Sequence, residues 1–310
     1  MESLLMAKNQ IVRIYARYES YFLAVFKFIL VLITMLLINA NIGYMTRLKN
    51  PAIALIMALL GSFLPLNMTI MLIGLIITAH VYELSLECAV VLLCVFVMMF
   101  IIYFRFTPTD GAAVLITPVL FSMNIPYIMP VALGLMGSPL SCVSVACGTV
   151  AYYVIDYVKK NADQLQNSSG DLESALNGFK YVIDGMLKNE TMYLMVLVFG
   201  VTTLLIYIIS RLSIPYCWKI AIGAGSLIEL IVLLVGNASL DADISIGFSI
   251  LGIVLGILVG LVIEFFAFNV DFTRTEYVQF QDDDYYYYVK AVPKVTLEAP
   301  QHKVKRINRD

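Results

Sequence analysis

The segment PAIALIMALLGSFLPLNMTIMLIGLIITAH, residues 51–80, is apolar enough to enter a membrane but has a proline near its middle. A proline removes one helical hydrogen bond and clashes with the preceding turn, so Pro65 predicts two helices here. A helix needs about 20 apolar residues to cross the hydrocarbon core of a bilayer. Each half falls short of that, so we expect a re-entrant hairpin or a pair of short helices.

A second broken segment follows. Residues 111–137 are apolar and break at Ser122–Pro126. An unbroken apolar run comes after each broken segment, which gives two units of similar plan, residues 51–104 and 111–158. The units align only with gaps of several residues, and apolar sequence of low complexity also gives such matches by chance.

The other apolar runs predict six full transmembrane helices, near residues 21–42, 84–104, 139–158, 191–210, 215–236 and 244–268. Composition agrees, since 61% of residues are hydrophobic and 14% are charged, whereas a soluble domain is about half apolar and a quarter charged. The sequence therefore predicts an all-α polytopic membrane protein with two additional broken segments. The lipid bilayer is its expected environment.

Three polar regions flank these helices. Residues 1–20 suit a helix lying at the membrane surface or a plain extension, and the loop 159–190 contains an amphipathic helix near 171–188. In the tail, residues 269–310, apolar and polar residues alternate around an acidic cluster, which predicts a β-hairpin with the aspartates at its turn. An isolated hairpin is marginally stable, so it would need a docking surface; a disordered tail is the alternative.

Charge predicts the topology. If each broken segment enters and leaves on one side, both termini lie on the same face as six basic residues: Lys8, Arg13, Arg17, Arg105, Arg211 and Lys219. The acidic loop 237–243 falls opposite, so the positive-inside rule predicts that both termini are cytoplasmic, although Arg47, Lys49 and the lysines of the 159–190 loop oppose this. The broken segments would then insert from opposite faces, an inverted repeat of the kind that many secondary transporters use.

Polar residues within the membrane are the candidate substrate or ion pathway. A break frees backbone groups that lipid cannot satisfy, and such groups persist only beside protein or a water-filled cavity. A carboxylate at a helix centre costs about 3 kcal/mol, so it normally faces a cavity or partner. The candidates are Ser62, Asn67, Ser122, Asn124, Glu229 and Glu87. The alternatives are simple kinked helices, a protonated Glu229 bonded to a neighbouring helix, and a Glu87 at the surface.

Small residues at three- and four-residue spacing predict tight helix packing, because they let helices approach closely in lipid. They are Gly252, Gly256, Gly260, Gly134, Gly137, Ser141, Ser144 and Gly148.

Motifs for ATP binding, zinc hydrolysis or a serine nucleophile are absent from the sequence, which has two histidines and five scattered cysteines. No cofactor, metal or nucleic acid is expected, and no catalytic motif is found. A compact polar set, Arg105, Thr107, Thr109 and Asp110, leaves open an enzyme that acts on a lipid-linked substrate.

Four stretches resemble a group of multi-spanning bacterial membrane proteins, some of which carry a permease label. They are RFTPTDG at 105–111, PYIMP at 126–130, GLMGSP at 134–139 and VQFQDDDYYYYVKAVPK at 278–294. The resemblance implies a bacterial cytoplasmic membrane setting, and no established activity comes with it.

The leading hypothesis is a membrane transport protein, a permease or a transporter subunit, with its pathway at the broken helices. The alternative is a scaffold or regulatory subunit without transport activity. Its tail, Glu276 to Lys294, would bind a partner protein or another copy of the chain.

Overall fold

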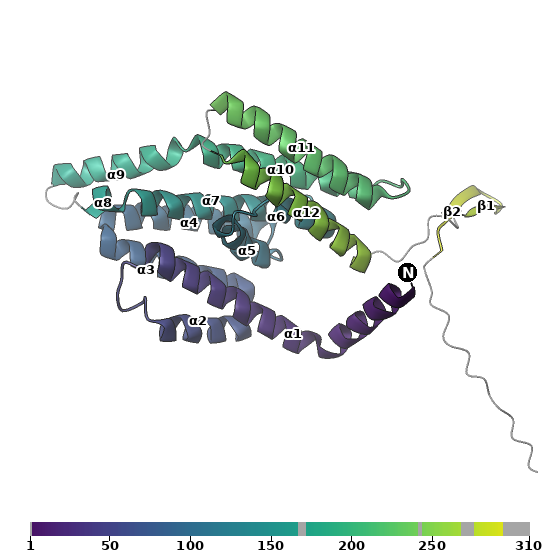
Figure 1. Ribbon diagram of the computed structural model, residues 1–310, viewed down its shortest axis with the longest axis horizontal. Coiled ribbons are helices and arrows are strands. Elements are labelled where there is room, and N and C mark those ends of the chain that lie inside the picture. The colour runs from purple at the N-terminus through teal and green to yellow at the C-terminus, as the bar shows by residue number, and fades with distance from the viewer. Residues whose placement is uncertain (1, 167–171, 241–243, 268–275, 294–310) are drawn as a thin grey trace, which may run out of the picture. The chain divides into compact units, whose positions relative to one another are not determined.

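A computed structural model describes residues 2–166, 172–240, 244–267 and 276–293. The elements are α1 (Glu2–Ile42), α2 (Pro51–Phe63), α3 (Leu66–Leu84), α4 (Leu86–Phe106), α5 (Gly111–Ser122), α6 (Ile128–Met136), α7 (Ser141–Lys160), α8 (Ala162–Gln166), α9 (Leu172–Leu187), α10 (Glu190–Ser210), α11 (Cys217–Leu240), α12 (Ile246–Ala267), β1 (Glu276–Gln281) and β2 (Tyr286–Ala291) (Figure 1). The end of the acidic loop, residues 241–243, and tail residues 268–275 and 294–310 lie outside the described residues.

The chain forms two compact units. One comprises residues 20–263, and the other comprises residues 1–19 together with 264–310. Within the described residues, seven helices are long and apolar enough to cross a membrane: α1, α3, α4, α7, α10, α11 and α12. The prediction of an all-α polytopic fold is confirmed, and the chain is a multi-pass integral membrane protein.

The first broken segment folds into a hairpin of α2 and α3. Its tip lies beside the early part of α1, where the Ser62 hydroxyl donates to the Ala24 carbonyl at 3.1 Å. Its base lies beyond the other end of α1, where the Met45 N–H donates to His80 Nδ1 at 3.3 Å. The chain therefore enters and leaves this hairpin at the face where α1 ends.

The expectation that both arms of this hairpin are short was wrong. The break falls at Pro65 as predicted, but α3 continues to Leu84 and has 19 residues, enough to span. At 1.5 Å per residue this arm is about 28 Å long, close to the thickness of the hydrocarbon core. The tip of this hairpin therefore lies near the opposite face and not at the membrane centre.

The second broken segment folds into a hairpin of α5 and α6 that enters from the other face. Its two ends meet where the Ser141 hydroxyl donates to Asp110 Oδ2 at 2.6 Å. At its tip, Phe121 stacks on Tyr152 with ring centroids 4.5 Å apart. Tyr152 lies eleven residues beyond the first residue of α7, so the tip sits about 16 Å along that helix. This hairpin therefore ends inside the membrane.

The predicted small residues lie where helices meet. Gly134 packs against Ile206, and Gly148 packs against Thr117. Gly225, which was not predicted, also packs against Ile206. The stripe on α12 follows α6 and α11: Gly252 and Gly256 contact Tyr127, and Gly260 contacts Val131 and Ile222. Gly137 packs against Ser141, and Ser144 donates to Thr107 Oγ1 at 2.7 Å. These contacts join α6 to α10 and α12, α11 to α10 and α12, and α7 to α5 and the end of α4.

The polar loop forms the predicted amphipathic helix, α9, which packs against α4 and α7. Its Gly185 lies against the Tyr157 ring, and Val182 and Met186 are buried. Residues 1–20 were expected to form a helix before the first span. The range of α1 joins two helices at a kink at Tyr18 (φ −121°, ψ 24°), and the first of them covers this segment from Glu2.

The tail forms the predicted β-hairpin. Strands β1 and β2 pair antiparallel, with Val278 opposite Val289 and Phe280 opposite Tyr287. Asp282 forms the turn: Oδ1 accepts from the N–H groups of Asp284 and Tyr285, and Oδ2 accepts from the Tyr287 hydroxyl. These hydrogen bonds lower the pKa of the Asp282 carboxyl.

Candidate functional site

The tip of the α5–α6 hairpin separates two cavities. One, of about 520 Å³, lies among α1, α3, α4, α5 and α7; we call it the apolar cavity. The other, of about 330 Å³, lies among the tip, α7, α10 and α12; we call it the polar cavity. Four residues line both: Phe121, Asn124, Tyr152 and Asp156. The second break thus lies between two cavities and lines both.

The apolar cavity has hydrocarbon walls and a polar end. Its wall residues include Leu37, Ile38, Ile70, Ile73, Ile77, Phe96, Met99, Phe100, Val114, Leu115 and Val119. The polar lining residues include Asn41, Ser122, Asn124, Asp156 and Lys159. Because α1 and α7 both end close to Asn41 and Lys159, this polar end lies toward the face where α1 ends.

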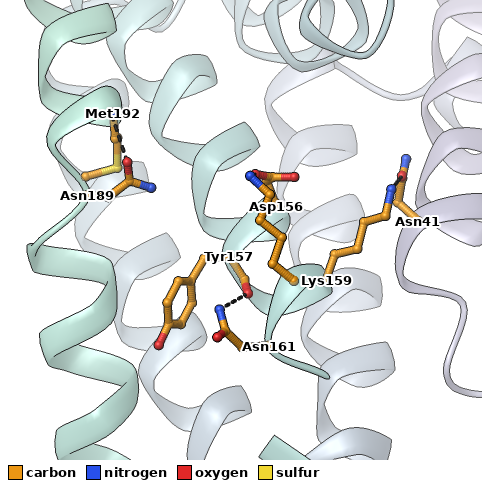
Figure 2. A network of polar contacts seen from close by, with 8 residues as sticks. Asn41, Asp156, Tyr157, Lys159, Asn161, Asn189 and Met192 are labelled. Atoms are coloured by element: carbon orange, nitrogen blue, oxygen red, sulfur yellow. Dashed lines mark hydrogen bonds and ion pairs between the residues drawn. The ribbon is translucent and has the colours of Figure 1, made fainter. Parts of the chain in front are cut away.

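Two lysines and one carboxylate set the charge at this end. Lys160 pairs with Asp156 at 2.8 Å, one helical turn apart on α7. Lys159 reaches across to α1 and donates to Asn41 Oδ1 at 2.7 Å (Figure 2). No carboxylate of the described residues forms an ion pair with Lys159. A neutral amide therefore holds one ammonium at the rim of the apolar cavity.

Asn124 occupies the point where the chain turns at the tip. Its φ is 60°, in the left-handed region that asparagine tolerates better than most other residues with side chains. The side chain is exposed to the cavities and has no hydrogen bond to any residue that the structure describes. A free amide in this position can donate to and accept from a bound solute.

Pro118, one turn before the tip, leaves a backbone carbonyl free to accept a hydrogen bond. It lies inside α5 and has no N–H, so the Val114 carbonyl loses its usual helical partner. Both residues line the apolar cavity. Ser122, which also lines it, donates to the Pro118 carbonyl at 3.1 Å, so its hydroxyl is bonded within α5 and the Val114 carbonyl keeps its free acceptor.

The polar cavity has a different character. Hydroxyl and amide side chains line the polar cavity, in addition to the residues that it shares with the apolar cavity. They are Tyr127, Ser249, Asn189, Thr191 and Ser245. Tyr127 and Ser249 join α6 to α12 through a hydrogen bond of 2.6 Å between their hydroxyls. Asn189 caps α10 by accepting from the Met192 N–H at 3.0 Å (Figure 2).

The polar residues of the first break lie elsewhere. Ser62 is bonded to α1, and Asn67 Oδ1 accepts from the Tyr103 hydroxyl at 2.7 Å. Neither lines either of the two cavities. The structure thus brings Ser122 and Asn124 together, but it does not join them to Ser62 and Asn67.

The two candidate glutamates also differ. Glu87 lies in the first turn of α4 and accepts a hydrogen bond of 2.7 Å from the Ser85 hydroxyl. Glu229 lies in the middle of α11, is fully buried, and neither of its carboxylate oxygens has a partner among the described residues. Glu87 has the surroundings of a helix-end residue, whereas Glu229 has no partner that accounts for it.

The compact polar set near Arg105 takes part in joints between helices. Asp110 accepts from Ser141, and Thr107 accepts from Ser144, so both tie the start of α7 to the end of α4. Thr109 donates to Asp110 Oδ1 at 3.2 Å. These contacts account for Thr107, Thr109 and Asp110 without a substrate.

Four residues of the site were absent from the sequence prediction: Asn41, Tyr127, Asp156 and Lys159. Charged and amide residues at the ends of membrane helices are ordinary, so the sequence does not mark them out. Their importance comes from tertiary packing, which places the ends of α1 and α7 beside the tip of the second hairpin.

Comparisons of the chain with protein-family models, with curated proteins and with solved structures find no match. The assignment that stands is therefore the one that the chain itself provides: a multi-pass α-helical membrane protein with a re-entrant hairpin between two cavities.

Proposed function

We propose that this protein is a transport protein of the cytoplasmic membrane and that its solute binds at the tip of the α5–α6 hairpin. The observation that carries the proposal is that the unpartnered Asn124 lines both cavities. Broken helices near the membrane centre are the usual binding elements of secondary transporters, because their freed backbone groups replace water around the solute.

The opposed hairpins support this proposal. One enters from the face where α1 ends, and the other enters from the face where α4 ends. Transporters with inverted repeats alternate access by moving one repeat against the other around a fixed site. In this chain the hairpins are unequal, so only the second would contribute binding groups.

The lining of the apolar cavity indicates the class of solute. Its walls are hydrocarbon, and Lys159 stands at its rim without a carboxylate partner among the described residues. Small-molecule sites are mostly apolar with a few placed polar groups that set orientation. We infer a small amphipathic anion, with its charged group at Lys159 and its apolar part between α3, α4 and α5.

The test uses purified protein in lipid nanodiscs and measures thermal unfolding with medium-chain alkyl carboxylates. A ligand at 100 times its Kd stabilises a protein by about 2.7 kcal/mol. The carboxylates should raise Tm, whereas alkyltrimethylammonium ions of equal chain length should not. Lys159→Gln should abolish the shift, and Lys188→Gln, at a lysine paired with Asp184 outside the cavities, should retain it.

Flux of the stabilising carboxylate into proteoliposomes then tests transport itself. Uptake that depends on Lys159 would support the proposal. Equal stabilisation by anion and cation, or a shift that survives Lys159→Gln, would contradict the solute class. Binding without flux would contradict transport.

The β-hairpin favours a second candidate, a scaffold that binds a partner protein through its tail. One face of the hairpin presents Val278, Phe280, Tyr287 and Val289, all exposed, with Phe280 and Tyr287 stacked at 4.9 Å. Deleting the chain from residue 276 distinguishes the two roles. A transporter should retain carboxylate binding after the deletion, whereas a scaffold should lose its partner in a pull-down from native membranes.

A further inference from the structure

Unsatisfied polar atoms gather at one level of the bundle. Within the part of the chain that the structure describes, six buried side-chain nitrogen or oxygen atoms have no hydrogen-bond partner. Four of them belong to three residues: Thr202, Ser226 and Glu229. Buried polar groups without partners are rare in native proteins and call for a specific explanation.

The three residues come together through the pairing of α10 and α11. Gly225 packs against Ile206, and eleven residues later Gly236 packs against Leu194. The helices are therefore antiparallel, and this register places Glu229 level with Thr202. Ser226 lies one turn from Glu229 on the same buried face of α11.

The helices around Glu229 offer no counter-ion. α10, α6 and α12 contain no lysine, arginine or histidine. Lys219 on α11 is ten residues away, about 15 Å along the helix. An ionised carboxylate without a partner is costly in a membrane interior, so in this conformation the side chain holds its proton.

A path to water begins at Tyr127. On α12, Gly260 packs against Ile222 and Gly252 packs against the Tyr127 ring. Glu229 lies seven residues beyond Ile222 on α11, and Gly252 lies eight residues before Gly260, so the Tyr127 ring is at about the level of Glu229. Tyr127 also packs in one buried cluster with Leu233, one turn beyond Glu229. Tyr127 and Ser249 share a short hydrogen bond, and both line the polar cavity. A hydroxyl pair of this kind can pass a proton between a cavity and a buried acid.

We propose that Glu229 is a proton-binding site that exchanges with the polar cavity through Tyr127 and Ser249, while Thr202 and Ser226 stand ready to solvate the carboxylate. On release, the O–H bond of the acid breaks and the proton passes to cavity water through the hydroxyl pair. The carboxylate left behind can then accept hydrogen bonds from the Thr202 and Ser226 hydroxyls after a small shift. If the protein is the transporter proposed above, this proton can be coupled to movement of the solute; that role rests on the proposed transport function, but the protonation itself does not.

The test is infrared spectroscopy of the whole protein in lipid, at neutral pH. The C=O stretch of a protonated carboxylic acid should be present in the wild type and lost in Glu229→Gln. The isosteric amide resembles the protonated acid, so this variant should keep its fold. Glu87→Gln is the matched control and should leave the band in place, because Glu87 is hydrogen-bonded at a helix end.

Transfer of the wild type to D₂O then tests exchange and needs no variant and no substrate. The band should move to lower frequency as deuterium replaces the proton, and Tyr127→Phe or Ser249→Ala should slow this shift several-fold. A band unaffected by Glu229→Gln, or one that never shifts in D₂O, would overturn the proposal. Failure of carboxylate binding or flux would contradict the transport function alone, since neither enters this measurement.

Discussion

At the residue scale, small side chains at helix crossings hold the bundle together, and one glycine offers a controlled test. A Cβ at Gly260 would lie 2.8 Å from Val131 Cγ1 and 3.1 Å from Ile222 Cγ1. Val131 and Ile222 are buried in the same contact and have little room to move. Overpacking of this kind costs about 1–3 kcal/mol.

Gly260→Ala should therefore lower the free energy of unfolding by about 1–3 kcal/mol, measured by denaturant titration in mixed micelles. Gly247→Ala is the control on the same helix, because nothing lies within 4 Å of a Cβ there. It should cause little or no loss. Equal effects of the two changes would show that α12 does not pack as described.

Single residues also show which parts of the site could be predicted from the sequence and which could not. Asn124 and Glu229 were identifiable because a polar residue in an apolar run is conspicuous and costly. Ser62 and Asn67 met the same criterion, yet both have hydrogen-bond partners within the protein: Ser62 bonds to α1, and Asn67 bonds to Tyr103. A sequence reveals that a polar group needs a partner, but only the fold shows whether the protein supplies one.

At the scale of elements, the β-hairpin depends on the ionised side chain of Asp282. Its pKa is lowered by the hydrogen bonds from Asp284 and Tyr285 N–H and from the Tyr287 hydroxyl. Because the folded pKa lies below the unfolded one, this contribution is fully present above the ordinary aspartate value. It is lost as pH falls through the lowered value.

Asp282→Asn at neutral pH should therefore speed amide hydrogen exchange across residues 276–291 of the full-length protein. In the wild type, the protection factors of these amides, which correct for the pH dependence of exchange in an unfolded chain, should fall when the pH drops below about 4, the ordinary aspartate range. Asp283→Asn is the adjacent control, since Asp283 makes none of these turn bonds. Identical exchange in the two variants would contradict the role of Asp282.

Element boundaries were predictable where charge and apolarity change sharply, as they do around α10, α11 and α12. The extent of α3 was not predictable in this way. The sequence predicts an apolar segment that ends at His80, but His80 is fully buried and accepts a hydrogen bond from the Met45 N–H, and α3 continues four residues further to Leu84.

At the scale of the whole molecule, two hairpins of unequal depth enter the bundle from opposite faces. The first has a spanning arm and brings its break close to the far face, where its polar residues are internally bonded. The second has arms of 12 and 9 residues and ends between the cavities. Entry of the two hairpins from opposite faces was predictable from the number of spans between them, whereas the difference in depth arises from packing.

The central claim is that the tip of the second hairpin is reached by water inside the membrane. The most direct measurement labels single cysteines with a membrane-impermeant maleimide in intact cells and inverted vesicles, after the five native cysteines are replaced. The test position is Asn124. Leu197, exposed at mid-height on α10, is the lipid-facing control, and Arg47 and Arg211 mark the loops at the two faces.

Asn124→Cys should react from the side that labels Arg47→Cys and not from the side that labels Arg211→Cys, while Leu197→Cys stays unlabelled from both. An Asn124→Cys as unreactive as Leu197→Cys, or one reached from the Arg211 side, would contradict the account.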